Sequence, residues 1–152
     1  MGFFTLETAQ AQVASGGNFG PWIWQLNLKV EQVTPDAFRV RLPYGEHVAR
    51  PGGVVIGQAM MALSDTIMVL AICEKLGRFA TLATISQTTN FMRAAVKCDV
   101  VGVARVVKLG RSTIFGEVEI FADGSTEPIA QAISSFALLP DGAGAFNRAD
   151  QR

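Results

Sequence analysis

The stretch that decides the fold runs from residue 54 to residue 72 and reads VVIGQAMMALSDTIMVLAI. Asp65 is the only formally charged side chain in it. Such a run predicts one long helix, residues 54–76, buried by its own protein on nearly all sides and closed by Gly77. Burial of an unpaired carboxylate is strongly unfavourable. We therefore expect Asp65 either to act in catalysis or binding or to be satisfied by backbone or an arginine.

Interruptions in the same stretch argue against a membrane span. Its length would suffice, but Gln58, Ser64, Asp65 and Thr66 interrupt the apolar run, and an aspartate at the centre of a bilayer is costly. No second candidate span is found along the chain. We expect no membrane partner.

Composition narrows the remaining function classes. The 152 residues fit a single domain, expected over residues 1–140, with a small polar tail over residues 141–152. Thirteen basic and thirteen acidic residues cancel, so no global charge attracts nucleic acid. Hydrophobic residues make up 49% of the chain and charged residues only 17%, which is apolar for a small monomer. We therefore expect a homodimer, or a dimer of dimers, whose interface hides apolar surface.

The two cysteines, Cys73 and Cys98, form neither a disulfide framework nor a metal motif. The N-terminal sequence MGFFTLETAQ lacks the basic segment and cleavage site of a secretory signal. Both observations favour a reducing, cytoplasmic setting, with no metal and no redox cofactor.

Strands are expected on both sides of the long helix. Alternation of apolar and polar residues predicts a strand pair over residues 24–33 and 37–42, preceded by a short helix capped by Thr5. Four longer strands follow the helix, and Gly110-Arg111 joins two of them as a tight hairpin. This order indicates an α+β fold with a long antiparallel sheet wrapped around one central apolar helix, as in the hotdog fold. The four later strands are expected over residues 80–92, 99–109, 113–121 and 128–138.

Three segments carry a resemblance to a known family. They read RPGGVVIGQAMMALSD (residues 50–65), TLATISQTTNFMRAA (81–95) and VVKLGRSTIFGEVEIF (106–121). Together they resemble the hotdog acyl-CoA thioesterases of the phenylacetate-degradation type, over roughly residues 24–139. This chain differs from the family in having Ile56-Gly57-Gln58 where His-Gly-Gly is common, and Arg50 where an asparagine is common.

The resemblance implies three catalytic roles. The N–H of Gly57 polarises the thioester carbonyl, Asp65 activates water or attacks directly, and Thr84 helps to hold the water. A helix N-terminus does offer free N–H groups and a positive dipole end to a developing oxyanion. Eight residues of helix span about 12 Å, so Gly57 and Asp65 of one chain cannot both reach one carbonyl carbon. If both act, they come from different subunits.

The sequence also suggests substrate contacts and two alternative functions. The resemblance implies that the substrate is an acyl-CoA, so CoA is expected to enter as part of the substrate. A hydratase or dehydratase that uses His47 as its base is a second hypothesis, and a non-catalytic acyl-CoA binder is a third. The residues expected to contact substrate are Arg50, Gln58, Arg93, Lys108, Arg111 and Ser112.

Overall fold

The computed structural model describes residues 2–142 and contains one extended sheet and one dominant helix. The residues of the predicted tail from 143 onward lie outside the described part. Four helical elements are present: α1 (Leu6–Val13), α2 (Pro21–Trp24), the 3-10 turn η1 (Glu46–Val48) and α3 (Gly57–Leu76). The strands are β1 (Lys29–Val33), β2 (Phe38–Leu42), β3 (Ala49–Arg50), β4 (Val54–Val55), β5 (Leu82–Phe91), β6 (Val100–Leu109), β7 (Thr113–Ala122) and β8 (Pro128–Leu138).

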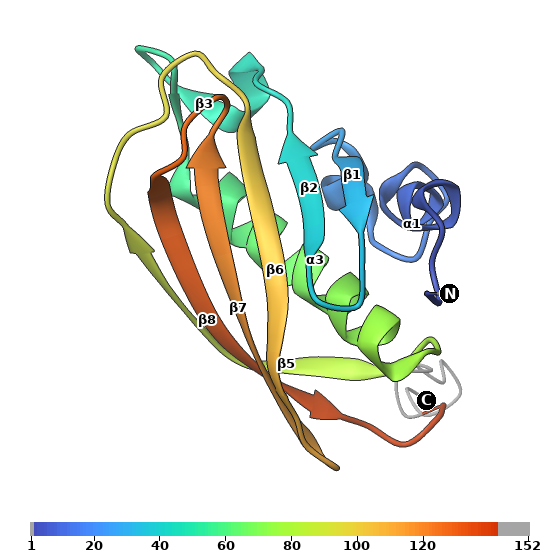
Figure 1. Ribbon diagram of the computed structural model, residues 1–152. Coiled ribbons are helices and arrows are strands. Elements are labelled where there is room, and N and C mark those ends of the chain that lie inside the picture. The colour runs from blue at the N-terminus through green and yellow to red at the C-terminus, as the bar shows by residue number, and fades with distance from the viewer. Residues whose placement is uncertain (1, 143–152) are drawn as a thin grey trace, which may run out of the picture.

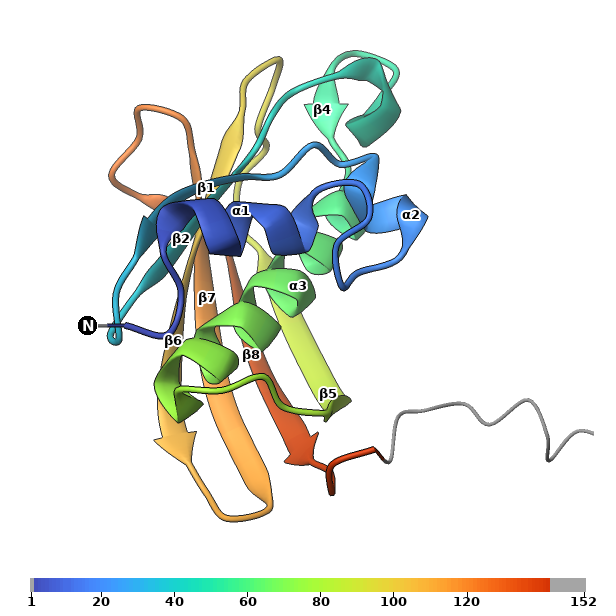
Figure 2. The same cartoon turned by 90° about the vertical axis from the view of Figure 1, so that its right-hand side faces the viewer.

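The sheet has six strands in the order β1-β2-β6-β7-β8-β5, and every neighbouring pair is antiparallel. Figures 1 and 2 show α3 lying across the inner face of this curved sheet. Buried side chains of α3, among them Leu63 and Ile67, form one core with inward-facing residues of the strands. The predicted α+β arrangement of a long antiparallel sheet around a central helix is confirmed.

The central helix begins three residues later than predicted. Val54 and Val55 form β4, which pairs with β3, and the N–H of Val55 donates to the carbonyl oxygen of Ala95 at 2.9 Å. Two β-branched residues with strand partners favour the extended conformation over the helix. At the other end, Gly77 adopts the left-handed conformation (φ 69°) that closes α3, as predicted.

The first predicted strand, residues 24–33, is wrong in its first half. Pro21 stands at the first position of α2, where a proline favours helix initiation. Asn27 then has a positive φ of 54°, which reverses the chain before β1 begins at Lys29. The apolar residues of this segment, including Leu26 and Leu28, are buried by a turn rather than by a strand.

The two edges of the sheet differ. At the β1 edge, the Gln10 side chain of α1 donates to the carbonyl oxygen of Leu28 (2.9 Å) and accepts from the N–H of Val30 (2.8 Å), as a neighbouring strand would. At the other edge, β5 pairs only with β8 among the described residues. An unpaired edge strand of this kind is a template for pairing with another strand.

The N-terminal segment is fixed to α3 by a buried acid. The Glu74 carboxylate is 6% exposed and accepts the backbone N–H groups of Phe3 (3.2 Å) and Phe4 (2.7 Å). The Phe3 and Phe4 rings pack on Phe79, so the start of the chain covers the end of α3. None of the helices in the described residues is long and apolar enough to cross a membrane.

Candidate active site

The central helix is buried on most sides, as predicted, but one face of it is open. Gln58 and Met61 are exposed, while Asp65 and Val69 are half-buried. Residues three or four positions apart share one helix face, so these four side chains form a single open stripe along α3. The sequence conceals this stripe because two of its members, Met61 and Val69, are apolar.

Asp65 lies at the middle of the open stripe and is held by the neighbouring strand. The hydroxyl of Thr84, on β5, donates to Oδ1 of Asp65 at 2.8 Å. Within residues 2–142, Asp65 has no basic partner in a salt bridge. Within the described chain the partner of the acid is therefore the Thr84 hydroxyl rather than an arginine.

A β-bulge in β5 sets the direction of the Thr84 side chain. The register of β5 against β8 shifts between Thr84 and Ser86, which leaves Ile85 as the extra residue. As a result Thr84 and Gln87, three positions apart, both reach α3, and Nε2 of Gln87 donates to the carbonyl oxygen of Met61 at 3.2 Å. Bulges next to functional sites commonly re-aim a side chain. Gln87 and the bulge were not predicted, because simple alternation places residues 84 and 87 on opposite faces.

The N-terminus of α3 presents unpaired donors. The first hydrogen bond of the helix runs from the N–H of Met60 to the carbonyl oxygen of Ile56 (3.4 Å), so the N–H groups of Gly57, Gln58 and Ala59 precede it. Ile56 caps the helix without a side-chain bond. Among the described residues, the N–H of Gly57 therefore has no acceptor, and it can receive one from a ligand.

Gly57 also borders a concavity of about 450 Å³, which Arg50, Gln58 and Arg93 help to line. A β-carbon on Gly57 would lie 3.0 Å from Cζ of Phe91, so the absent side chain lets this ring pack against the helix start. The structure thus brings three of the six predicted substrate contacts to one place beside the predicted oxyanion donor.

Asp65 and Gly57 occupy different parts of one chain, as the helix spacing predicts. Eight residues of α3 separate them, about 12 Å along the axis. Thr84 accompanies Asp65, whereas Phe91, seven residues further along β5, accompanies Gly57. Each chain therefore carries two candidate half-sites, the Asp65 half-site with the acid and the Gly57 half-site with the free N–H groups.

The other predicted substrate contacts lie away from the Gly57 pocket within a single chain. The β6–β7 hairpin carries Lys108, Arg111 and Ser112. It lies at the Thr84 end of the sheet, because Thr84 of β5 is aligned across β8 and β7 with Leu109 of β6. Arg93 lines the Gly57 pocket, but its guanidinium also pairs with the carboxylate of Glu127. These roles stay predictions.

His47 lies on the surface in η1 and is not among the residues that line the pocket beside Gly57. Within residues 2–142, no group of three or more histidine, cysteine, aspartate or glutamate side chains is arranged to hold a metal ion. The two cysteines are free, Cys73 buried and Cys98 half-buried.

The fold is a curved antiparallel sheet around a central helix, and one acidic residue lies on the open face of that helix. This arrangement defines the protein as a member of the hotdog-fold class. The family model of the thioesterase superfamily matches residues 52–129, and the chain belongs to that superfamily. This stretch contains both half-sites, from the glycine turn before α3 to the start of β8.

Individual relatives agree with the family assignment. A Thermoplasma volcanium protein whose name ascribes esterase activity to it is 31% identical over 99 residues, covering 62% of this chain and 74% of its own length. Zebrafish thioesterase superfamily member 2 superposes with a TM-score of 0.76 at 25% identity, over 90% of this chain and 95% of its own. A Haemophilus influenzae thioesterase shares the fold, with a TM-score of 0.78 at 21% identity over 90% and 91% of the two chains.

Proposed function

We propose that this protein hydrolyses acyl-CoA thioesters to the free acid and CoA, at a site that two copies of the chain build together. One observation carries the proposal: a half-buried carboxylate, Asp65, is held by the Thr84 hydroxyl at 2.8 Å on a helix face left open beside an unpaired sheet edge. Membership of the thioesterase superfamily supports the reaction class.

Asp65 is proposed as the general base. The Thr84 hydroxyl occupies one lone pair of Oδ1, which leaves Oδ2 to accept a proton from water. The water oxygen then forms a bond to the thioester carbonyl carbon, and collapse of the resulting tetrahedral intermediate breaks the carbon–sulfur bond. The proton taken by Asp65 returns to the departing CoA sulfur. Direct attack by Asp65 would instead expel the CoA thiolate and form a mixed anhydride. Hydrolysis of that anhydride at its Asp65 carbonyl carbon, in a single turnover in ¹⁸O-labelled water, would leave label in the Asp65 carboxylate, which the general-base route never does.

The N–H of Gly57 from the partner chain is proposed to stabilise the oxyanion. It is unpaired in the described chain and lies at the positive end of the α3 dipole. Since about 12 Å of helix separates it from Asp65 in one chain, the donor and the base must come from two subunits.

A homodimer through the β5 edge supplies this arrangement. Apolar side chains gather there: Ile85 is 59% exposed, Phe91 48% and Met61 40%. Antiparallel pairing of two β5 strands about a twofold axis would cover them and reverse the direction of the partner's helix. The Gly57 half-site of each copy would then approach the Asp65 half-site of the other, giving two sites per dimer.

The twofold symmetry also brings the remaining predicted substrate contacts toward the site. Arg50 and Gln58 accompany the Gly57 half-site, where they are proposed to contact the CoA side of the thioester. A twofold axis through β5 also turns the partner's β6–β7 hairpin toward that end of the sheet. Lys108, Arg111 and Ser112 are therefore proposed to act on CoA, together with Arg93, from the two copies jointly.

The decisive experiment measures thiol release from aliphatic and aromatic acyl-CoAs by the wild type, Asp65→Asn and Asp36→Asn. Asp36 is a surface acid whose side chain is 91% exposed, and it serves as the matched control. The proposal predicts turnover in the wild type and the control and its collapse in Asp65→Asn. Unchanged turnover in Asp65→Asn would contradict the mechanism, and binding without turnover on any ester would favour an acyl-CoA binder.

The hydratase alternative has its own test: water addition to an enoyl-CoA that disappears in His47→Ala. The exposed position of His47 outside the Gly57 pocket does not favour it. Action without metal or redox cofactor, a cytoplasmic setting, and a dimer of dimers stay predictions from the sequence.

A further inference from the structure

A second concavity, of about 470 Å³, lies further along the two elements that carry Asp65 and Thr84. Val69 lies one helical turn after Asp65 on the same face of α3, and Leu82 lies two residues before Thr84 on the same strand. The two elements that carry the Asp65–Thr84 pair therefore also form two walls of this cavity.

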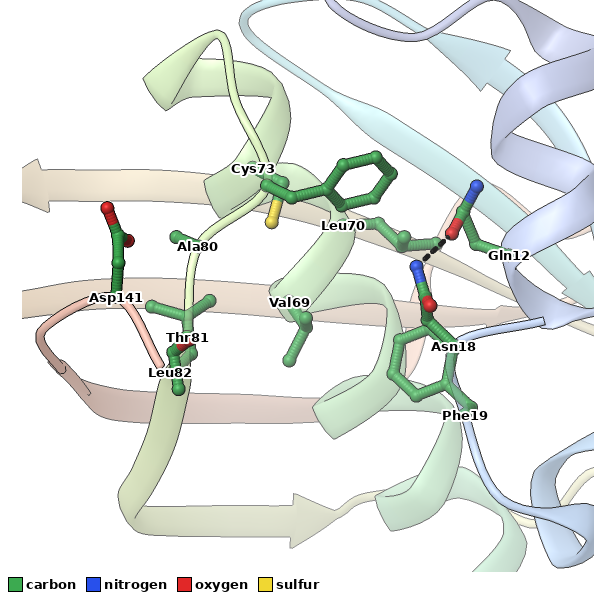
Figure 3. A pocket seen from close by; sticks show the side chains of 11 residues that line it. Gln12, Asn18, Phe19, Val69, Leu70, Cys73, Ala80, Thr81, Leu82 and Asp141 are labelled. Atoms are coloured by element: carbon green, nitrogen blue, oxygen red, sulfur yellow. Dashed lines mark hydrogen bonds between the residues drawn. The ribbon is translucent and has the colours of Figure 1, made fainter. Parts of the chain in front are cut away.

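The third wall comes from the N-terminal segment. Phe19, in the loop between α1 and α2, faces the cavity, and Figure 3 shows it on the opposite side from Leu82. The side chain of Asn18 donates to Oε1 of Gln12 at 2.6 Å, which ties this loop to α1. The loop between α1 and α2 therefore forms this wall together with α1.

The lining of the cavity is mainly apolar. Leu70 and Phe79 contribute hydrophobic surface, and the Cys73 sulfur projects toward the centre in Figure 3. Burial raises the pKa of the Cys73 thiol, which keeps it neutral and gives it the character of a small apolar group. A concavity of this volume is within the range of small-molecule sites.

No unengaged cation faces the cavity among the described residues that line it, whose one charged member is Asp141. The nearby Arg78 donates to two of the lining residues, to Oδ1 of Asp141 at 3.4 Å and to the carbonyl oxygen of Phe79 at 3.1 Å. A carboxylate that entered the cavity would lose hydration without gaining a free partner.

We infer that this cavity, named here the Val69 cavity, binds the acyl group of the substrate, and that it selects extended uncharged acyl groups over short ones and over those that end in a carboxylate. The inference rests on the proposed thioesterase function. It assigns the acyl side of the thioester to the Val69 cavity of the chain that supplies Asp65, and the CoA side to the half-site of the chain that supplies Gly57.

The length of the acyl group sets the expected difference in kcat/KM. Burial of one methylene group is worth about 0.8 kcal/mol, which corresponds to about a fourfold rise in kcat/KM per added methylene. Four methylene groups separate the two, so the wild type should prefer octanoyl-CoA to butyryl-CoA by about 200-fold. Suberoyl-CoA, which has the length of octanoyl-CoA but a terminal carboxylate, should fall well below octanoyl-CoA.

The test compares the wild type with Val69→Phe and Ala80→Leu, which fill the cavity from two different walls. Val107→Phe, at a surface position 64% exposed on β6, is the matched control. The ratio of kcat/KM for octanoyl-CoA to that for butyryl-CoA should fall at least tenfold in both cavity variants and stay at the wild-type value in the control. An unchanged ratio in both folded cavity variants overturns the inference while leaving the thioesterase function intact.

A binding measurement separates the inference from the reaction. S-octyl-CoA and S-butyl-CoA are thioethers, which cannot be hydrolysed. Their affinities, measured by calorimetry, report binding in the cavity without turnover. Tighter binding of the octyl compound that is lost in Val69→Phe would uphold the cavity assignment even if the wild type hydrolysed no ester. Equal affinities of the two thioethers for the wild type would refute it.

Discussion

Replacement of Gly57 by proline would remove a single N–H group from the first turn of α3. Gly57 is the first helical residue, a position that tolerates proline because its N–H has no partner within the helix. The preceding residue, Ile56, has φ −75° and ψ 145°, which is the conformation that a following proline requires. The backbone can therefore accept the ring while losing the one donor that the mechanism uses.

The matched control is Gly57→Ala. A β-carbon at this position would lie 3.0 Å from Cζ of Phe91 and 3.2 Å from its Cε1, so both substitutions press on the same ring. Only the proline also deletes the N–H. Any activity difference between the two variants therefore measures the donor rather than the steric contact.

Loss of one oxyanion donor typically lowers kcat by about a hundredfold to a thousandfold, or roughly 3–4 kcal/mol. We expect Gly57→Pro to lose that much relative to Gly57→Ala, measured as thiol release from octanoyl-CoA at saturation, with unchanged urea midpoints of unfolding. A proline variant as active as the alanine variant would refute the assignment of the Gly57 N–H to the oxyanion.

Three further outcomes follow from particular contacts. Thr84→Val removes a hydrogen bond to a charged carboxylate, worth roughly 2 kcal/mol, so kcat should fall about thirtyfold, whereas Thr84→Ser should retain most activity; equal rates for the two would contradict the contact with Asp65. Glu74→Ala leaves two N-terminal N–H groups without their acceptor and should lower the free energy of unfolding by roughly 2–3 kcal/mol in urea titration. Half-buried Cys98 should react with iodoacetamide before Cys73, which is buried and whose pKa burial raises; faster labelling of Cys73 would contradict protection of its thiol by burial.

Long apolar segments made the fold predictable from sequence. Residues 54–76 gave a helix whose C-terminal closure at Gly77 is observed, and the last strand, Pro128–Leu138, has the predicted bounds. Hydrophobic periodicity reports burial within one chain, and it identified these elements because they pack on the core. It failed at residues 24–28, where apolar residues are buried by a turn and where proline and asparagine geometry decides the path.

The site was only partly predictable. Asp65 stood out because it is the single charge in an apolar run. The family resemblance named Thr84 as a residue that holds water, but the hydrogen bond from Thr84 to Asp65 was not predicted. The open stripe on α3 was not foreseen, since Met61 and Val69 are apolar and their exposure depends on where the sheet ends. The bulge at Ile85 was not foreseen either, because register depends on pairing with β8 rather than on local sequence.

A subunit-mixing experiment tests the shared site most directly. Asp65→Asn and Gly57→Pro chains are each expected to be inactive alone, and they are unfolded together and refolded in equal amounts. About half of the dimers are then mixed, and each mixed dimer has one site with both Asp65 and Gly57 intact, so about a quarter of wild-type thiol release should return. No recovery, with mixed dimers demonstrated by native mass spectrometry, would contradict a site built from the acid of one chain and the N–H of its partner.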